Sequence, residues 1–234
     1  MTDGGGGRVD PGSKAADRLA ATNASALPGW LHPVAEAAAK IRPQDLSRFL
    51  PPDDGARDSA VLILLGMGPD GPDLLLIERA HDMRSHAGQP AFPGGQVEPG
   101  DGGPVAAALR EAAEETGLEP RGIDVFATLP TLWLPYTNHA VTPVLAWWRE
   151  PSPVSVVDPA EVASVHRVPI AELTDPANRV RVRHPSGYLG PGFTVRGLLV
   201  WGFTAGLIDR LLWLVGWERP WDVGRVVDLP ESAQ

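Results

Sequence analysis

The stretch AFPGGQVEPGDGGPVAAALREAAEETGL, residues 91–118, joins a turn-rich loop directly to a helix that carries several acids. Glycine and proline crowd its first half, and Gly117 follows the last periodic residue, so a helix is expected from about 104 to 116. At ~100° per residue, one side of this helix is apolar and the other is acidic. The apolar stripe contains Val105, Ala108, Leu109, Ala112 and Thr116, and the acidic sector contains Glu111, Glu114 and Glu115.

The position of the acidic sector is unfavourable for an isolated helix. The glutamates lie toward the C-terminal end, where the helix dipole disfavours negative charge, and they repel one another. Arg110 precedes Glu114 by four residues and is expected to form an ion pair with it. A hard dication such as Mg²⁺ would remove both penalties, and the glycines of the loop would let the backbone approach a diphosphate. The alternative is an ordinary solvated charged face.

The segment from Arg110 to Leu118 resembles the end of the Nudix box, G-x5-E-x7-R-E-U-x-E-E-x-G-U, where U is aliphatic. Gly102 stands where that pattern has its lone glutamate, and Glu98 and Asp101 are the nearby acids. Resemblance to the Nudix hydrolase superfamily implies an α/β (α+β) fold, an α/β/α sandwich with a mixed β-sheet. It also implies a Mg²⁺ or Mn²⁺ cofactor. The implied catalytic residues are Arg110, Glu111, Glu114 and Glu115, and the three glutamates are the implied metal ligands.

The upstream segment LLLIERAHDMRSHAGQPAFPGGQVEPGD, residues 74–101, is similar to the signature of the coenzyme A diphosphatase branch of that superfamily. The resemblance implies that a loop after a strand grips the substrate. The implied substrate-binding residues are Arg79, Arg84, His86, Gln89, Gly94 and Gly95. The implied reaction is metal-dependent hydrolysis of coenzyme A or acyl-CoA, giving 4′-phosphopantetheine, or its acyl form, and adenosine 3′,5′-bisphosphate.

The rest of the chain predicts a mixed sheet covered by helices, because strands and helices alternate without a regular βαβ rhythm. Apolar runs at 59–67 and 74–79, separated by a Pro/Asp/Gly turn, predict a hairpin or adjacent strands. Further strands are expected at 123–129, 141–148, 162–168, 179–184 and 193–196, and helices at 169–174 and 198–215. The domain boundaries follow: a flexible tail at 1–28, a helical extension and linker at 29–58, the Nudix domain at 59–218 and a C-terminal tail at 219–234.

Composition narrows the function further. The formal net charge is −9 and cysteine is absent, which argues against a nucleic-acid surface, an anionic-membrane surface, a disulfide framework and thiolate chemistry. The N-terminus lacks the pattern of a signal peptide, and Asp209 and Arg210 interrupt the apolar run at 197–217. We therefore expect a cytoplasmic protein whose partner is a small nucleoside diphosphate derivative, with coenzyme A favoured and a homodimer as an option.

Several assignments stay open at this level. The general base is one of the glutamates or Glu161, which is otherwise a surface charge. Arg179, Arg181 and Arg183 alternate along a strand, so they form either a solvated edge or a site for the 3′-phosphate of coenzyme A. Three functions remain: a coenzyme A diphosphatase, a Nudix enzyme for ADP-ribose, dinucleotides or damaged nucleotides, and a non-catalytic Nudix-like binding module. The intact acidic cluster weighs against the third.

Overall fold

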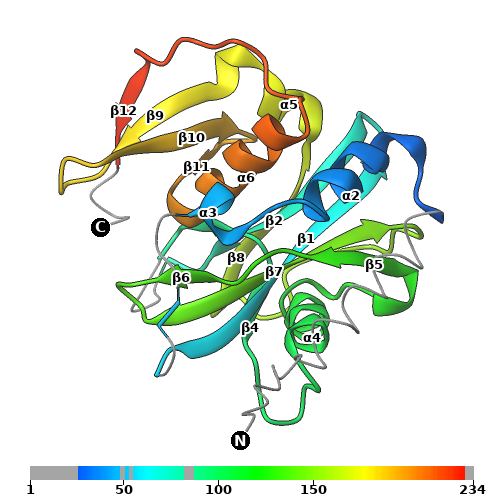
Figure 1. Ribbon diagram of the computed structural model, residues 1–234. Helices are drawn as coiled ribbons and strands as arrows, with labels where there is room; N and C mark the ends of the chain where they lie inside the picture. Colours follow the sequence, from blue (N-terminus) through cyan, green and yellow to red (C-terminus); the bar gives the residue numbers. More distant parts are fainter. Residues whose placement is uncertain (1–25, 48–50, 53–54, 82–86, 230–234) are drawn as a thin grey trace, which may run out of the picture.

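The computed structural model describes residues 26–47, 51–52, 55–81 and 87–229, which form two β-sheets with helices packed on them (Figure 1). The larger sheet has eight strands: β1 (Arg57–Gly68), β2 (Gly71–Arg79), β3 (Pro90–Ala91), β4 (Gly94–Gln96), β5 (Ile123–Thr128), β6 (Leu132–Leu134), β7 (His139–Trp148) and β8 (Val162–Pro169). Strand β1 pairs in parallel with β7 and antiparallel with β2 and β4. The expected mixed sheet is confirmed, and β1 and β2 form the expected hairpin.

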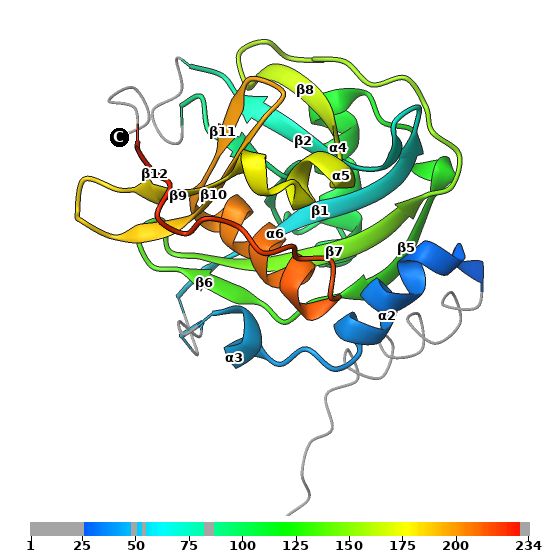
Figure 2. The same cartoon turned by 90° about the horizontal axis from the view of Figure 1, so that it is seen from above.

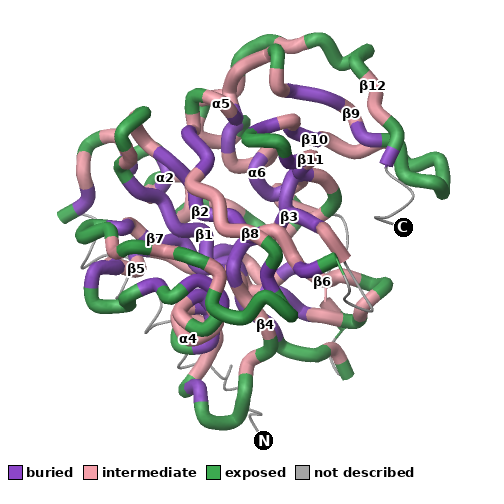
Figure 3. The backbone as a smooth tube through the Cα atoms, turned by 180° about the vertical axis from the view of Figure 1, so that it is seen from behind, coloured by how far each residue is buried: buried purple, intermediate pink, exposed green. Residues whose placement is uncertain are grey.

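Three main helices cover the two faces of this sheet. Helix α4 (Pro104–Thr116) packs on one face, over β1, β4 and β7. Helices α2 (His32–Ala38) and α6 (Gly202–Leu214) pack on the other face, where Leu31, Val34, Ile208 and Leu212 join the apolar cluster around Ile63. Figure 3 shows that the buried backbone is concentrated where β1 and β2 pass between these layers. The α/β/α sandwich is therefore confirmed.

The continuous apolar run that predicted β1 reflects burial on both sides. Leu62 and Leu64 face the α4 cluster, whereas Ile63 and Leu65 face the α2 and α6 cluster, and all four are buried. A strand covered on both faces has no solvent side, so it lacks the alternation of polar and apolar residues.

A second, smaller sheet lies beside the sandwich (Figure 2). Its strands are β9 (Arg179–Arg183), β10 (Leu189–Val195), β11 (Leu198–Val200) and β12 (Val226–Asp228), in the order β11-β10-β9-β12. The helix expected from 198 begins only at Gly202, because Arg196 and Gly197 take positive φ angles of 52° and 79° and turn the chain into β11. Part of the expected C-terminal tail forms β12, which pairs in parallel with β9.

The remaining helices are short. They are η2 (Gly29–Leu31), α3 (Pro43–Leu46), η3 (Pro120–Gly122), α5 (Ile170–Thr174) and η4 (Pro176–Asn178). Within the described ranges, no helix is long and apolar enough to cross a membrane.

Candidate active site on helix α4

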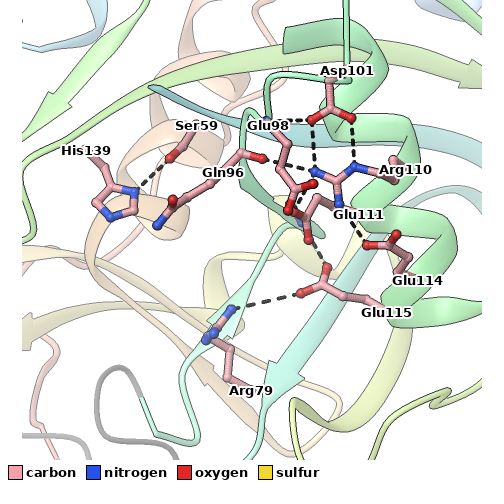
Figure 4. A network of polar contacts seen from close by, with 11 residues as sticks. Ser59, Arg79, Gln96, Glu98, Asp101, Arg110, Glu111, Glu114, Glu115 and His139 are labelled. Atoms are coloured by element: carbon pink, nitrogen blue, oxygen red, sulfur yellow. Dashed lines mark hydrogen bonds and ion pairs between the residues drawn. The ribbon is translucent and has the colours of Figure 1, made fainter. Parts of the chain in front are cut away.

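Helix α4 has the bounds that the sequence predicted, and it ends at Gly117, which adopts a left-handed φ of 69°. Ala107, Ala108 and Ala112 are fully buried against the sheet. Because alanine side chains are short, the helix lies close to β1 and β4, and its acidic sector lies beside the edge formed by β4. Figure 4 shows the polar side chains that gather there.

Arg110 is the central cation of this group. Its Nε and Nη2 donate to the two Asp101 carboxylate oxygens at 2.7 and 3.0 Å, and its Nη1 donates to Glu114 Oε2 at 2.8 Å. Nη2 also donates to the Gln96 carbonyl at 3.1 Å. The predicted Arg110–Glu114 ion pair is therefore present, and the same guanidinium ties α4 to β4.

Asp101 belongs to this polar group, although the predicted site residues did not include it. Its carboxylate is nearly buried, accepts from Arg110 and also accepts from the Glu98 N–H at 2.7 Å. The hydrogen bonds from Arg110 and Glu98 hold the pKa of Asp101 below its ordinary value. Asp101 thus supplies an acidic partner for Arg110 where the neighbouring Gly102 has no side chain. The signal was its match to the signature in residues 74–101.

The Glu111 carboxylate packs directly against Gly95 of the glycine loop. A Cβ atom on Gly95 would lie 2.4 Å from the Glu111 carboxylate carbon, so only glycine leaves room for this carboxylate. Arg110 Nη2 lies 3.0 Å from Glu111 Oε1. Burial raises the pKa of Glu111 above its ordinary value, although Arg110 opposes the shift.

Glu115 is the most buried of the three glutamates, with only 5% of its surface exposed. Its Oε2 accepts from the Gly94 N–H at 2.9 Å, and its Oε1 lies 4.0 Å from Arg79 Nη1. Burial raises the pKa of Glu115 to about 7, with Gly94 and Arg79 acting in the opposite direction. A solvated charged face is therefore excluded for Glu115. Glu114, in contrast, is 58% exposed and lies at the rim.

Glu161, the open candidate for the general base, lies next to this cluster at the start of β8. It is exposed, and its carbonyl accepts from the Ala80 N–H at 2.9 Å. Its charge contributes to the raised pKa of both Glu111 and Glu115. The structure thus brings a fourth glutamate into the electrostatic surroundings of α4.

The donor set fits a hard divalent cation. Glu111 and Glu115 are both ionisable carboxylates whose charged forms burial disfavours, and a cation would reverse that penalty. Among the described residues, no three acidic or histidine side chains form a ready-made cage. Mg²⁺ needs none, because it takes one or two carboxylates and fills its octahedron with water and phosphate oxygens.

The predicted substrate-binding residues divide into two groups. Arg79, Gly94 and Gly95 lie beside Glu115 and Glu111, and Gln89 is buried, its carbonyl accepting from the Arg79 N–H at 3.2 Å. Arg84 and His86 lie outside the described residues.

The arginines of β9 do not join this site. Figures 1 and 2 place β9 in the second sheet, away from α4. Arg179 is 1% exposed, pairs with Asp209 and Glu218, and packs between the Phe193 and Trp221 rings at 4.7 Å from each centroid. For Arg179, both the expected solvated edge and the expected 3′-phosphate contact are wrong, because its side chain is enclosed in the protein.

This chain is similar to several known proteins. Residues 56–187 match the family model for the NUDIX domain. A protein of Cronobacter sakazakii named "Uncharacterized Nudix hydrolase NudL" is 40% identical over 171 residues, covering 70% of this chain and 85% of that protein. A protein of the same name from Escherichia coli O7:K1 is 38% identical over 167 residues, covering 68% and 83%. The crystal structure of the M. smegmatis Nudix hydrolase RenU aligns with a TM-score of 0.49 at 22% identity, covering 70% of this chain and 88% of that one.

Proposed function

This chain belongs to the Nudix hydrolases, enzymes that act on diphosphate bonds, and from this premise we propose that its substrate is coenzyme A or acyl-CoA. The products are 4′-phosphopantetheine, or its acyl form, and adenosine 3′,5′-bisphosphate. Hydrolysis adds water across the phosphoric anhydride, so each product keeps one of the two phosphates.

The observation that carries this proposal is the segment at 74–101. Its sequence is similar to the coenzyme A diphosphatase signature. Three of its residues meet α4 directly: Arg79 lies beside Glu115, Gly95 makes room for Glu111, and Asp101 holds Arg110. Residues of the signature segment thus contact or make room for the charged side chains of α4, which supports a diphosphate site at this place.

The chain's own residues have distinct tasks in this proposal. A bound Mg²⁺ or Mn²⁺ supplies charge neutralisation at the phosphates and lowers the pKa of water. Glu111 and Glu115 would hold the cation, Glu114 would contribute at the rim, and Arg110 orients the set through Asp101. Arg79 donates to phosphate oxygens, for which its planar fork is suited. Glu161 remains a candidate for accepting the proton of the attacking water.

Arg179 is not the contact for the 3′-phosphate, because its side chain is enclosed and β9 belongs to the second sheet. The proposal therefore rests on the diphosphate and its signature loop, and it assigns no role to Arg181 or Arg183.

A substrate panel tests the proposal. Coenzyme A, an acyl-CoA, ADP-ribose, diadenosine polyphosphates and oxidised dGTP are each incubated with Mg²⁺ or Mn²⁺, and the products are separated by chromatography. We expect coenzyme A to have the highest kcat/KM and to give the two named products. A clear preference for ADP-ribose or a dinucleotide would replace the substrate but keep the chemistry. Absence of turnover on every substrate would favour the binding-module alternative.

A further inference from the structure

A chain of polar contacts lies on the face of β2 opposite to Arg79. Ser164 Oγ is 2.7 Å from Glu78 Oε2 and 2.6 Å from His166 Nε2. His81 Nε2 lies 3.5 Å from the second oxygen of Glu78. The proposed reaction uses none of these four residues, yet Glu78 immediately precedes Arg79, which lies beside Glu115.

The direction of these hydrogen bonds is fixed by the proton count. An ionised carboxylate only accepts, so the single Ser164 hydroxyl proton is donated to Glu78. His166 Nε2 must then donate its own proton to Ser164 Oγ. Burial lowers the pKa of His166, with Arg196 adding to the shift and Glu78 opposing it, so near pH 7 the ring is neutral. Every donor in the chain Glu78–Ser164–His166 therefore has an acceptor.

This chain is located at an irregularity in the pairing of β2 with β8. Glu78 pairs with Ser164, but the next residue, Arg79, pairs with Val162, so Ala163 is an extra residue on β8. The Ala80 N–H then donates to the Glu161 carbonyl. A β-bulge of this kind bends a strand and redirects its side chains, and such bulges occur next to active sites.

Glu78 and Arg79, the two residues of β2 at the bulge, point to opposite faces of the sheet. Leu76 belongs to the cluster under α6 and Leu75 to the cluster under α4. Since side chains alternate along a strand, Glu78 faces the α6 side and Arg79 the α4 side. The Glu78–Ser164 hydrogen bond thus joins β2 to β8 at the last residue pair before the bulge and before Arg79. A slip of one residue there would move the Arg79 side chain to the wrong face.

We propose that Glu78, held by Ser164 and His166, is a positioning residue that keeps the Arg79 guanidinium directed at the substrate diphosphate. This inference rests on the proposed function in one respect, because it takes Arg79 as a diphosphate ligand. Glu78 itself touches no reacting atom. Its contribution passes through the backbone of β2 to its neighbour.

A double-mutant cycle with Mg·ADP tests the inference, because ADP carries a diphosphate and lacks the pantetheine arm. Isothermal titration calorimetry gives the Kd for the wild type, Ser164→Ala, Arg79→Ala and the double variant. We expect each single substitution to raise Kd about 10-fold, and the double variant to bind no more weakly than Arg79→Ala. Ser164→Thr keeps the hydroxyl and should restore Kd to within ~2-fold of the wild type.

Thr131→Val is the matched control, because it removes another hydroxyl contact of the same sheet, to Thr142 Oγ1 at 3.0 Å. Its Kd should equal that of the wild type. If Ser164→Ala does not fold, Glu78→Gln replaces it, and its effect must also vanish without Arg79. Additive effects, an unchanged Kd in Ser164→Ala, or a wild type that does not bind Mg·ADP would each overturn the inference. Failure of coenzyme A in the substrate panel would leave it intact.

Discussion

Two arginine-centred clusters in this protein share a composition but differ in their surroundings. Arg110 contacts Asp101, Glu111 and Glu114 on α4 and its loop, and Arg179 of β9 contacts Asp209 in α6 and Glu218 beyond that helix. Arg179 is enclosed between two aromatic rings and is 1% exposed, whereas a quarter of the Arg110 side chain is exposed. The Arg179 guanidinium is therefore enclosed in the protein, whereas the Arg110 guanidinium is open to solvent.

The balance of charge differs as well. Around Arg110 and Arg79 lie Asp101, Glu111, Glu114 and Glu115, so carboxylates outnumber guanidiniums. In the other cluster, both Arg179 and Arg210 offset the burial that raises the pKa of Asp209. An open cluster with surplus carboxylates is suited to a cation, while an enclosed arginine with its two acids is suited to anchoring the chain. This contrast distinguishes a site from a structural ion pair, and each prediction below tests it.

The largest expected effect is the loss of activity on metal removal. In excess EDTA we expect turnover of the best diphosphate substrate to fall by at least ~1000-fold, because the cation neutralises charge that develops in the transition state. Adding Mg²⁺ or Mn²⁺ in excess should restore it. Activity that persists in EDTA would remove the reason for the surplus carboxylates on α4.

Glu111→Gln and Glu115→Gln should each lower kcat by at least ~100-fold, since each removes one charged ligand of the cation. Far-ultraviolet circular dichroism should be unchanged, because both side chains lie off the apolar stripe. Glu119→Gln serves as a control, because this glutamate is exposed beyond the end of α4. If either variant kept near-full activity, the role assigned to that glutamate would be wrong.

Arg179→Met should lower the stability of the protein and leave its activity nearly unchanged, the opposite of the glutamate variants. Removing the cation leaves Asp209 and Glu218 without their partner, so the free energy of unfolding should fall by about 2–3 kcal/mol. The kcat/KM of the folded protein should stay within ~2-fold of the wild type, because the cluster is remote from α4. Urea denaturation and steady-state kinetics check the two halves. A large loss of kcat/KM without loss of stability would make the second cluster part of the active site.

Local signals explain which parts of the fold the sequence could predict. The bounds of α4 follow from Pro104, Gly117 and the helical period between them, all within one segment. The sequence did not predict strand β11. The turn at Arg196 and Gly197 comes directly before an apolar run, and that run is also compatible with a helix. Short apolar strands and buried helices cannot be separated by periodicity alone.

The site was predictable where its residues are adjacent in the chain, and less so where they meet through folding. The Arg110–Glu114 pair follows from helical spacing. The enclosure of Arg179 depends on Phe193 and Trp221, which lie in other segments of the chain. The RVRVR pattern of β9 does not indicate that these rings pack on it. Likewise, the burial of Glu115 depends on the approach of Gly94 from β4.

The smallest expected effect, and the most specific to the open cluster, is a pH-dependent stability of the metal-free protein. The pKa of Glu115 is about 7 in the folded state against 4.5 ordinarily. Well below pH 4.5 the Glu115 carboxyl is protonated in both states and does not lower the stability, whereas above pH 7 the folded protein bears the full cost of a buried charge. That gap corresponds to about 3 kcal/mol.

In EDTA, Glu115→Gln should therefore nearly match the wild type in free energy of unfolding at pH 4.5 and exceed it by about 3 kcal/mol at pH 8. Urea denaturation at pH 4.5, 6 and 8 measures the difference, and Glu119→Gln should show none at any pH. Mg²⁺ at pH 8 should stabilise the wild type more than the variant, because only the wild type offers the charged ligand. A difference that stayed constant with pH, or grew toward acid, would mean that Glu115 bears no cost when ionised. The surplus of carboxylates would then not explain why this cluster, unlike that of Arg179, attracts a cation.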